Sequence, residues 1–390
     1  MKKISLFLLI AFCFSSCKNN HTLVDNSFGL PQSLVSLEID IDLDEVSLNS
    51  YYIHSGYVYQ GDDYLLAYNH NTNDFDVFNI STKAISHIKL MPEGPNGIFH
   101  PGVVYAHAVD SIWVYTEDNV ISLVDSAGIV KERISIPESD TMPFLMVNFS
   151  LCTAKLYFHA SRKSLFYLSF AIKNDKNNFY AQEYSLSDHS VKFYPLKAIE
   201  DYDFRNQYGW KQFPNVTFNE HSILYNFPVE SNIYVLDIES GKTSVYGGKS
   251  RFTPNQVSKL IMPYSFEQAN RHLCENVHFY EILYEPEKDI YYRLHSGRID
   301  FDSHIDFYSL VYSKEIFLTV FNNKFEIINE TKLDRQKYNI FNCWGVTGKG
   351  FFIGKDNLYY QDINYEQLQL DVFNLEDYSS SMTVTPAPPN

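Results

Sequence analysis

One pattern recurs six times along the chain: a strand rich in aromatic and β-branched residues, a small polar turn, and a second strand. The turns lie near residues 82, 127, 188, 240, 322 and 364. Their mean spacing, about 56 residues, is close to the roughly 40–50 residues of a propeller blade. Because an isolated hairpin is marginally stable in water, these units must pack against one another. The repeat therefore predicts a β-propeller of six blades, with seven left open.

Shorter strands precede most of these hairpins and supply each blade with an inner pair. The plainest example is residues 279–296, the expected inner pair of the fifth blade, in which Tyr280, Ile282 and Tyr284 are spaced to share one face. Pro286 and the neighbouring charges favour an exposed turn. Four antiparallel strands per unit, packed around an axis, bury their faces and leave short, protected edges. We expect one all-β propeller domain over residues 33–376, with short helical or loop insertions.

Two of the hairpins carry more specific expectations. Asn322 and Asn323 can take the positive φ of a type I′ turn, which predicts the tightest hairpin of the set. In the last unit, residues 357–362 are predicted to form a strand that pairs with residues 367–373.

Helical pattern is scarce in this chain. Good helix formers around residues 266–273 predict a helix within an insertion over residues 253–276. Further insertions are expected at residues 199–215 and 297–306. Such loops generally meet ligands at the mouth of a ring, because rigid blades hold variable loops there.

Residues 35–46 alternate apolar and acidic side chains, which predicts a strand with one buried and one acidic face. A calcium loop needs a glycine after its third acid, whereas Glu45 follows Asp44 here, so calcium is not expected. This strand lies outside the six hairpins. We expect it to add to the last blade, which would close the ring and link the two ends of the chain.

The N-terminus has the organisation of an export signal. Two lysines precede an apolar run over residues 4–14, too short to span a bilayer comfortably, and small residues precede Cys17. This arrangement resembles the lipobox of bacterial lipoproteins, in which the cysteine is lipidated and becomes the mature N-terminus; ordinary cleavage beside an incidental cysteine is the alternative. We predict a signal peptide at residues 1–16, a lipid-anchored tether at 17–32 and a disordered tail at 377–390.

Charge and cysteine usage exclude two classes of protein. Removing the signal peptide takes away two lysines and no acid, so the net charge changes from −16 to −18. A phosphate backbone would be repelled, and nucleic acid is therefore not an expected partner. Cys152, Cys274 and Cys343 are far apart in the sequence and form no CxxC pair, so the fold is not a disulfide scaffold.

Several segments are similar to a known group of proteins. EGPNGI at residues 93–98, DSIWVY from Asp110, DIYYRLHS and KFEIINETKL, together with the lipobox, resemble the propeller lipoproteins of unknown function found in Bacteroidota. The resemblance covers most of the mature chain, but its motifs are structural and bring no catalytic residue. It implies a lipid-anchored protein of the bacterial cell envelope. Surface-exposed members carry acids directly behind the lipidated cysteine, so Lys18, Asn19 and Asn20 imply an outer-membrane protein that faces the periplasm.

The best binding candidate is the segment at residues 201–213, DYDFRNQYGWKQF. It combines aromatic and basic side chains in a stretch too polar for a blade core, a mixture typical of interfaces and sugar-stacking surfaces. The alternative is that its aromatics cap the apolar end of a blade. The candidate ligand or partner contacts in this segment are Tyr202, Arg205, Tyr208 and Trp210. Arg293 and His295 are further candidates, which would line the central channel if their strand is the innermost one of its blade.

Two clusters of reactive side chains are candidates for a metal site or a catalytic site. His272, Cys274 and His278 supply three ligands without a fourth nearby, at a spacing that matches no common zinc motif, so we predict no metal. An alternating run at residues 300–306 places acids beside His304, which would act as a base oriented by a carboxylate. A solvated strand face explains that run equally, and no nucleophile lies beside it. No cofactor is expected.

Two functions are consistent with these patterns. The first is a non-enzymatic, lipid-anchored propeller that binds an envelope protein or a glycan from its loop face. The second is a propeller hydrolase or lyase that acts on a polysaccharide. The first is favoured because the sequence contains no strong convergent set of acids, bases or metal ligands.

Overall fold

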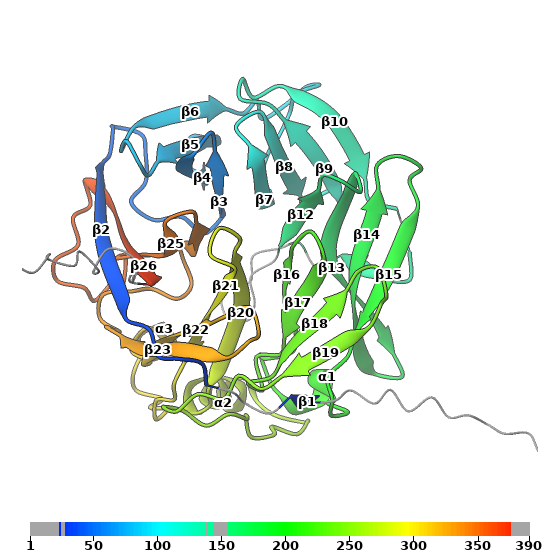
Figure 1. Cartoon of the computed structure of the whole chain (residues 1–390), viewed down its shortest axis with the longest axis vertical. Helices are drawn as coiled ribbons and strands as arrows, with labels where there is room; N and C mark the ends of the chain where they lie inside the picture. Colours follow the sequence, from blue (N-terminus) through cyan, green and yellow to red (C-terminus); the bar gives the residue numbers. More distant parts are fainter. Residues whose placement is uncertain (1–22, 25–27, 138, 144, 146–154, 376–390) are drawn as a thin grey trace, which may run out of the picture.

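The structure of this protein is a computed structural model that describes residues 23–24, 28–137, 139–143, 145 and 155–375. Six β-sheets stand around a central axis, which is the arrangement of a β-propeller (Figure 1). The prediction of an all-β, six-bladed propeller is confirmed. The predicted signal peptide, Cys17, Cys152 and the C-terminal tail lie outside the described residues.

The first three blades follow one another along the chain, each from an innermost to an outermost strand. Blade 1 consists of β3 (His54–Tyr59), β4 (Asp62–Asn69), β5 (Asp74–Asn79) and β6 (Ile85–Lys89). Blade 2 consists of β7 (Pro101–Ala108), β8 (Ser111–Thr116), β9 (Val120–Val124) and β10 (Val130–Ser135). Blade 3 consists of β12 (Leu156–His159), β13 (Ser164–Lys173), β14 (Lys176–Ser185) and β15 (Val191–Leu196), with β11 (Met142–Pro143) beside β13.

The last three blades include both ends of the described chain. Blade 4 consists of β16 (Asn215–Phe218), β17 (Ser222–Asn226), β18 (Ile233–Asp237) and β19 (Thr243–Tyr246), with β1 (Leu23–Val24) parallel to β19. Blade 5 consists of β20 (His278–Glu285), β21 (Ile290–Ser296), β22 (Ile316–Phe321) and β23 (Ile327–Leu333). Blade 6 consists of β24 (Trp344–Thr347), β25 (Gly350–Gly354), β26 (Gln367–Leu375) and β2 (Leu34–Asp42).

The ring is closed by β2, which comes from the N-terminal side and forms the outer strand of blade 6. It pairs antiparallel with β26 along all nine of its residues. Ile39 and Ile41 face the core, whereas Leu37 is 56% exposed. The acidic alternating strand therefore links the two ends of the chain, as predicted.

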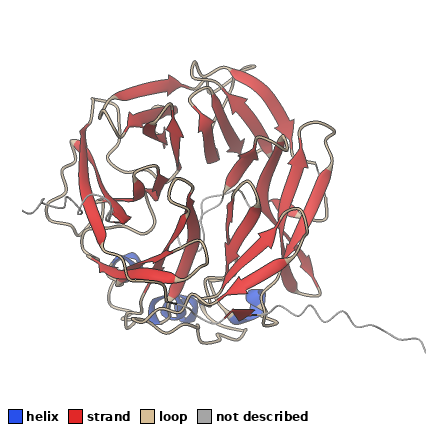
Figure 2. Ribbon diagram, viewed as in Figure 1, coloured by secondary structure: helices blue, strands red, loops and turns tan. Residues whose placement is uncertain are grey.

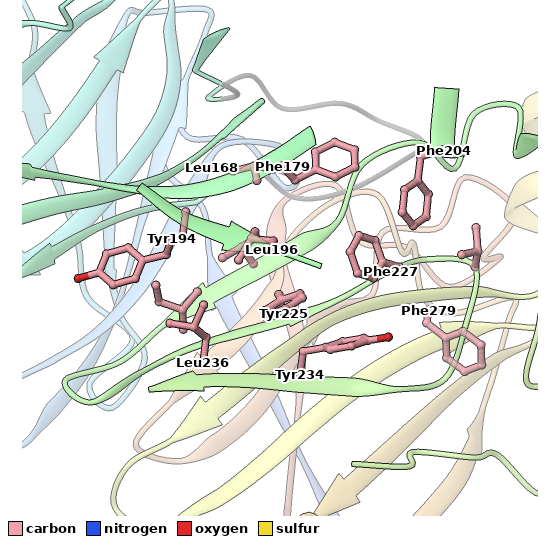
Figure 3. Packing of buried hydrophobic residues seen from close by; sticks show 14 of the residues in the cluster. Leu168, Phe179, Tyr194, Leu196, Phe204, Tyr225, Phe227, Tyr234, Leu236 and Phe279 are labelled. Atoms are coloured by element: carbon pink, nitrogen blue, oxygen red, sulfur yellow. The ribbon is translucent and has the colours of Figure 1, made fainter. Parts of the chain in front are cut away.

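The hydrophobic core lies between neighbouring blades. In the described part of the chain, six clusters of buried apolar side chains fill the six junctions between blades. Adjacent residues of β4 illustrate the principle, because Leu65 packs toward blade 6 and Leu66 toward blade 2. A strand covered on both faces reads as a continuous apolar run, and β22 is buried at all six positions. Figure 3 shows the junction of blades 3 and 4, where Tyr194 lies near Leu236.

A bulge changes the predicted faces of β20. Its register with β21 shifts between Phe279 and Ile282. Tyr280 and Leu283 consequently pack toward blade 6, while Ile282 packs toward blade 4. Residues 279–296 do form the inner pair of blade 5, but the prediction that Tyr280, Ile282 and Tyr284 share one face is wrong.

The predicted type I′ turn between β22 and β23 is also wrong. The positive φ, 58°, belongs to Phe325 and not to either asparagine. The Phe325 ring lies 4.6 Å from that of Tyr246 and 4.5 Å from that of Tyr291, between centroids. Burial of this ring between two blades holds a backbone conformation that a bulky residue rarely adopts.

The predicted strand at residues 357–362 forms turns instead, and the partner of β26 is β25. The cause is Asn357, whose side-chain amide donates to three backbone carbonyls, those of Tyr312 at 3.3 Å, Arg335 at 2.8 Å and Tyr338 at 3.0 Å. These contacts anchor the start of a loop. Leu358 is left 67% exposed.

Three short helices lie in the insertions (Figure 2): α1 (Phe204–Gln207), α2 (Phe266–Glu275) and α3 (Phe307–Tyr312). The predicted helix is confirmed as α2, which begins with a capping box between Ser265 and Gln268. Sequence patterns did not indicate α3. Residues 300–306 form an exposed loop before it and no strand edge. None of the helices that the structure describes is long and apolar enough to cross a membrane.

Ring closure can be tested on β2. We expect Ile41→Ala to lower the free energy of unfolding by about 2–5 kcal/mol, because the side chain is fully buried between blades 6 and 1. Leu37→Ala, on the same face of the strand but 56% exposed, is the matched control and should change it by less than about 0.5 kcal/mol. Denaturant unfolding measures both values. Equal effects would contradict the assigned register of β2.

Candidate functional site

A cavity of about 790 Å³ occupies the central axis of the ring. Its walls come from the innermost strands of all six blades, which Figure 1 shows around the axis: β3, β7, β12, β16, β20 and β24. The turns that join the first and second strands of blades 4 and 5 line it as well, through Glu220, His221, Glu287 and Asp289. A concave site built on rigid strands is the usual location of a small-molecule ligand.

An aromatic wall runs across blades 2, 3 and 4. The ring of Tyr105 meets that of Tyr157 edge-on at 5.3 Å, and Tyr157 stacks on Phe218 at 6.1 Å. The Tyr157 hydroxyl donates to Oε1 of Glu220 at 3.1 Å. Each of these rings lines the cavity. The wall therefore offers flat apolar surface beside polar groups, a combination suited to the faces and hydroxyls of sugar rings.

An ion pair connects two blades at the cavity. The Lys155 Nζ atom lies 3.0 Å from Oε1 of Glu281, whose side chain is 1% exposed. Lys155 precedes β12 in blade 3, whereas Glu281 lies on β20 in blade 5. The β20 bulge falls at Glu281 and re-aims its side chain. Lys155 lines the cavity, whereas the Glu281 carboxylate is buried and holds the ammonium in place.

His54, on β3 in blade 1, adds a neutral polar group to the lining of the cavity. Its Nε2 atom lies 3.0 Å from the carbonyl oxygen of Trp344, so Nε2 carries the proton in that hydrogen bond. Desolvation of the ring, together with the nearby charge of Lys155, lowers the pKa of His54 to about 4. The imidazole is uncharged at neutral pH and acts through hydrogen bonding.

The predicted binding segment at residues 201–213 packs largely into the protein. Tyr202 and Tyr208 are 7% and 1% exposed and belong to the core between blades 3 and 4. The Tyr202 hydroxyl donates to Glu230 at 3.0 Å. Arg205 remains at the surface, 3.3 Å from Asp175. Core packing accounts for both tyrosines, and ligand binding through them stays a prediction.

Trp210 differs from those tyrosines because it is partly exposed. Its Nε1 donates to Oδ1 of Asn270 at 3.1 Å, and its ring meets that of Phe266 edge-on at 5.4 Å. The segment therefore docks on α2. It does not line the central cavity.

Arg293 and His295 lie on β21, the second strand of blade 5, so the condition for lining the channel is not met. Both are fully buried between blades 4 and 5. Arg293 donates to the carbonyls of Ser231, at 2.7 Å, and Gly248. Burial lowers its pKa to about 9. These contacts give Arg293 a structural role, in which it binds backbone of the neighbouring blade.

His295 is enclosed by aromatic rings. It stacks between Phe279, at 5.4 Å, and Phe317, at 4.9 Å, and its Nε2 lies 3.2 Å from Oγ of Ser250. Burial holds the pKa of His295 well below its usual range, so the ring is neutral.

The other reactive side chains form no metal-binding group. His272 bonds the carbonyl of Ser258 at 2.7 Å, Cys274 is buried, and His278 lies 3.1 Å from the ammonium of Lys211. His304 is exposed in its loop. Within the described residues, no three His, Cys, Asp or Glu side chains are grouped so as to hold a metal ion.

Sequence reasoning missed the residues that line the cavity. Tyr105, Tyr157 and Phe218 look like any other blade aromatics, because strand order alone does not say which strand is innermost. One signal was available for Glu281, an acid within the aromatic run FYEILY. An acid at such a position indicates either an exposed face or a buried partner, and only the fold identified Lys155 as that partner.

The architecture defines the class of protein: a six-bladed β-propeller with a polar and aromatic axial cavity. A family model described as a domain of unknown function, DUF4221, matches residues 32–332, and the chain belongs to this family. The predicted resemblance to propeller proteins of unknown function is thereby confirmed. No curated protein matches the chain.

Many solved structures are similar to this chain, and two of them come from Bacteroides species. A member of the DUF4221 family from Bacteroides vulgatus is 20% identical, with a TM-score of 0.75, over 89% of this chain and 99% of that one. A protein of Bacteroides fragilis, whose name proposes that it is exported, is 9% identical, with a TM-score of 0.56, over 91% of this chain and 100% of that one. At these identities the likeness supports the fold alone.

The ion pair at the cavity can be tested by a double-mutant cycle. Lys155→Met removes the cation beside a buried carboxylate and should destabilise the protein more than the double variant Lys155→Met/Glu281→Gln does. We expect a coupling energy of about 0.5–3 kcal/mol from denaturant unfolding. Additive single effects would mean that the pair does not form in solution.

The pH dependence of stability tests the environment of His54. Between about pH 6.5 and 4 the unfolded chain binds a proton at His54 that the folded protein excludes. The contribution of His54 to the free energy of unfolding is therefore full above pH 6.5. It falls as the pH is lowered toward 4, by up to about 1.4 kcal/mol per pH unit. His54→Gln should make the slope of unfolding free energy against pH shallower in this window. An unchanged slope would show that the ring is solvated.

Proposed function

We propose that this protein is an exported binding module of the bacterial cell envelope, anchored by lipid on Cys17, whose axial cavity binds a glycan. The observation that carries the proposal is the cavity of about 790 Å³ with its aromatic wall of Tyr105, Tyr157 and Phe218. Flat rings suit the apolar faces of sugars, and the polar groups beside them suit sugar hydroxyls.

The polar groups are well placed for that role. Lys155, which is held by the buried Glu281, supplies a charged donor, Glu220 supplies an acceptor, and His54 supplies a neutral imidazole. A neutral ligand rich in hydroxyls can bond to each of them without carrying a charge into the cavity. The same set supports binding more directly than cleavage, and the polysaccharide hydrolase or lyase is kept as an outcome of the experiment below.

Export and anchoring rest on the N-terminal sequence. The lipobox before Cys17 predicts lipidation, and the similar Bacteroides fragilis protein bears a name that proposes export. The proposed location is the outer membrane, facing the periplasm. Mass spectrometry of the mature N-terminus, with Cys17→Ser as the comparison, tests the lipid anchor.

Glycan binding is tested by screening the purified protein against an array of neutral and charged oligosaccharides and titrating the hits by calorimetry. We expect Tyr157→Ala to weaken binding roughly tenfold or more, because it removes the centre of the aromatic wall. Tyr365→Ala, a surface tyrosine that is 69% exposed and outside the cavity, is the control and should bind normally. Thermal unfolding confirms that both variants are folded.

Two outcomes would change the proposal. Equal affinity of Tyr157→Ala and wild type would place the ligand elsewhere on the protein. Shortened oligosaccharides after incubation, detected by mass spectrometry and lost in Lys155→Met, would favour the enzyme.

A further inference from the structure

Three insertions of blades 5 and 6 leave large apolar side chains at the surface. They connect β19 to β20, β21 to β22 and β25 to β26. The side chains that we call the insertion patch are 47–69% exposed: Phe266, Ile305, Tyr308, Leu358 and Tyr359. Exposed apolar groups gathered in one region mark an interaction site more often than single exposed residues do.

Contacts between the insertions hold these three segments side by side. The Tyr359 hydroxyl hydrogen-bonds Oγ of Ser309, the residue after Tyr308. The Tyr359 ring lies 6.5 Å from that of Tyr312, at the end of α3. Both α2 and α3 rest on one small buried cluster, and Figure 2 shows them at the same rim of the ring; the cluster contains Leu273, Cys274, Leu310 and Val311.

The patch is held in a defined conformation. Lys314 is buried, and its Nζ donates to the carbonyls of Leu273 and Asn276 at 2.9 Å each, which ties the end of α2 to the loop after α3. The Asp306 side chain caps α3 by accepting from the backbone of Ser309 at 3.0 Å. A preorganised surface loses little conformational entropy when a partner binds.

Charge selects the kind of partner. The three segments that carry the patch, residues 258–276, 298–312 and 357–366, contain seven acidic and three basic residues. One of the bases, Arg271, is already shared between Glu267 at 3.6 Å and Glu275 at 3.2 Å. An apolar surface with an acidic surround is complementary to an apolar segment flanked by Lys and Arg.

We propose that the insertion patch is the docking surface for a protein partner whose contacting segment is apolar and flanked by basic residues. A second copy of this chain would bring the same acidic residues face to face, and an anionic lipid surface would be repelled in the same way. Trp210 belongs to the rim of this surface through its contact with Phe266.

The insertion patch and the turns at one end of the cavity are on opposite faces of the ring. The insertions join second to third strands or connect successive blades, whereas the turns that line the cavity join first to second strands. In a blade of four antiparallel strands these two kinds of connection lie at opposite ends of the strands. A docked partner therefore leaves the cavity open, and the two sites can fail independently.

Photo-crosslinking in cells tests the surface on the full-length, membrane-attached protein. Tyr308→p-benzoylphenylalanine places the probe in the patch, and Phe193→p-benzoylphenylalanine, on β15 and 38% exposed, is the matched control. We expect the Tyr308 probe alone to link to one polypeptide, through a peptide rich in Lys and Arg. Added salt should lower the yield, because the charges at the rim are screened.

Second-site variants make the test specific. Phe266→Asp and Leu358→Asp should each lower the crosslink yield about tenfold or more, whereas Phe193→Asp, on β15 of blade 3, should not. Glycan binding by Leu358→Asp should equal that of wild type. The proposal is overturned if the Tyr308 probe links to a second copy of this chain or to lipid, yields the same products as the Phe193 probe, or yields none.

Discussion

Packing of each blade against two neighbours is the interaction on which the rest of the structure depends. The middle strands carry apolar side chains on both faces, as Leu65 and Leu66 do on β4, so a single blade would expose both apolar faces to water. A ring removes this problem because every blade then has two neighbours. Closure requires the chain ends to meet, and β2 achieves this by pairing with β26 along its whole length. Buried polar groups follow the same logic, since Arg293 satisfies carbonyls of blade 4 from its place in blade 5.

Ring closure also creates the axial cavity. Its polar groups come from different blades: His54 comes from blade 1, and Lys155, from the start of blade 3, is held by the buried Glu281 of blade 5. None of these groups is near another in the sequence, so the site exists only in the assembled ring. The β20 bulge contributes by aiming Glu281, and such bulges commonly re-aim a side chain at a functional position. The two proposed sites are then separate, with a ligand in the axial cavity and a partner on the insertion patch.

These constraints explain why the structure places several predicted site residues elsewhere. Tyr202 and Tyr208 belong to a segment whose composition is typical of a binding site, yet both side chains complete the core between blades 3 and 4. Composition does not separate the two roles, because aromatic residues suit an interface and a core equally. Arg293 and His295 were predicted to line the channel if their strand is innermost, but β21 is the second strand of blade 5 and lies one strand away from the axis. Residues 357–362 have high β-strand propensity, but the three hydrogen bonds of the Asn357 side chain hold them in a loop.

The sequence by itself determined the repeat of hairpins, a ring of six or seven blades, the helix α2 and the closing role of the acidic strand, because each depends on local periodicity and on an apolar face that must be covered. Tertiary structure decided which side chains share a surface. The side-chain parity of a strand is lost at one bulge, and contacts across the axis join residues of different blades. The cavity, the pair of Lys155 with Glu281 and the insertion patch all belong to this second kind.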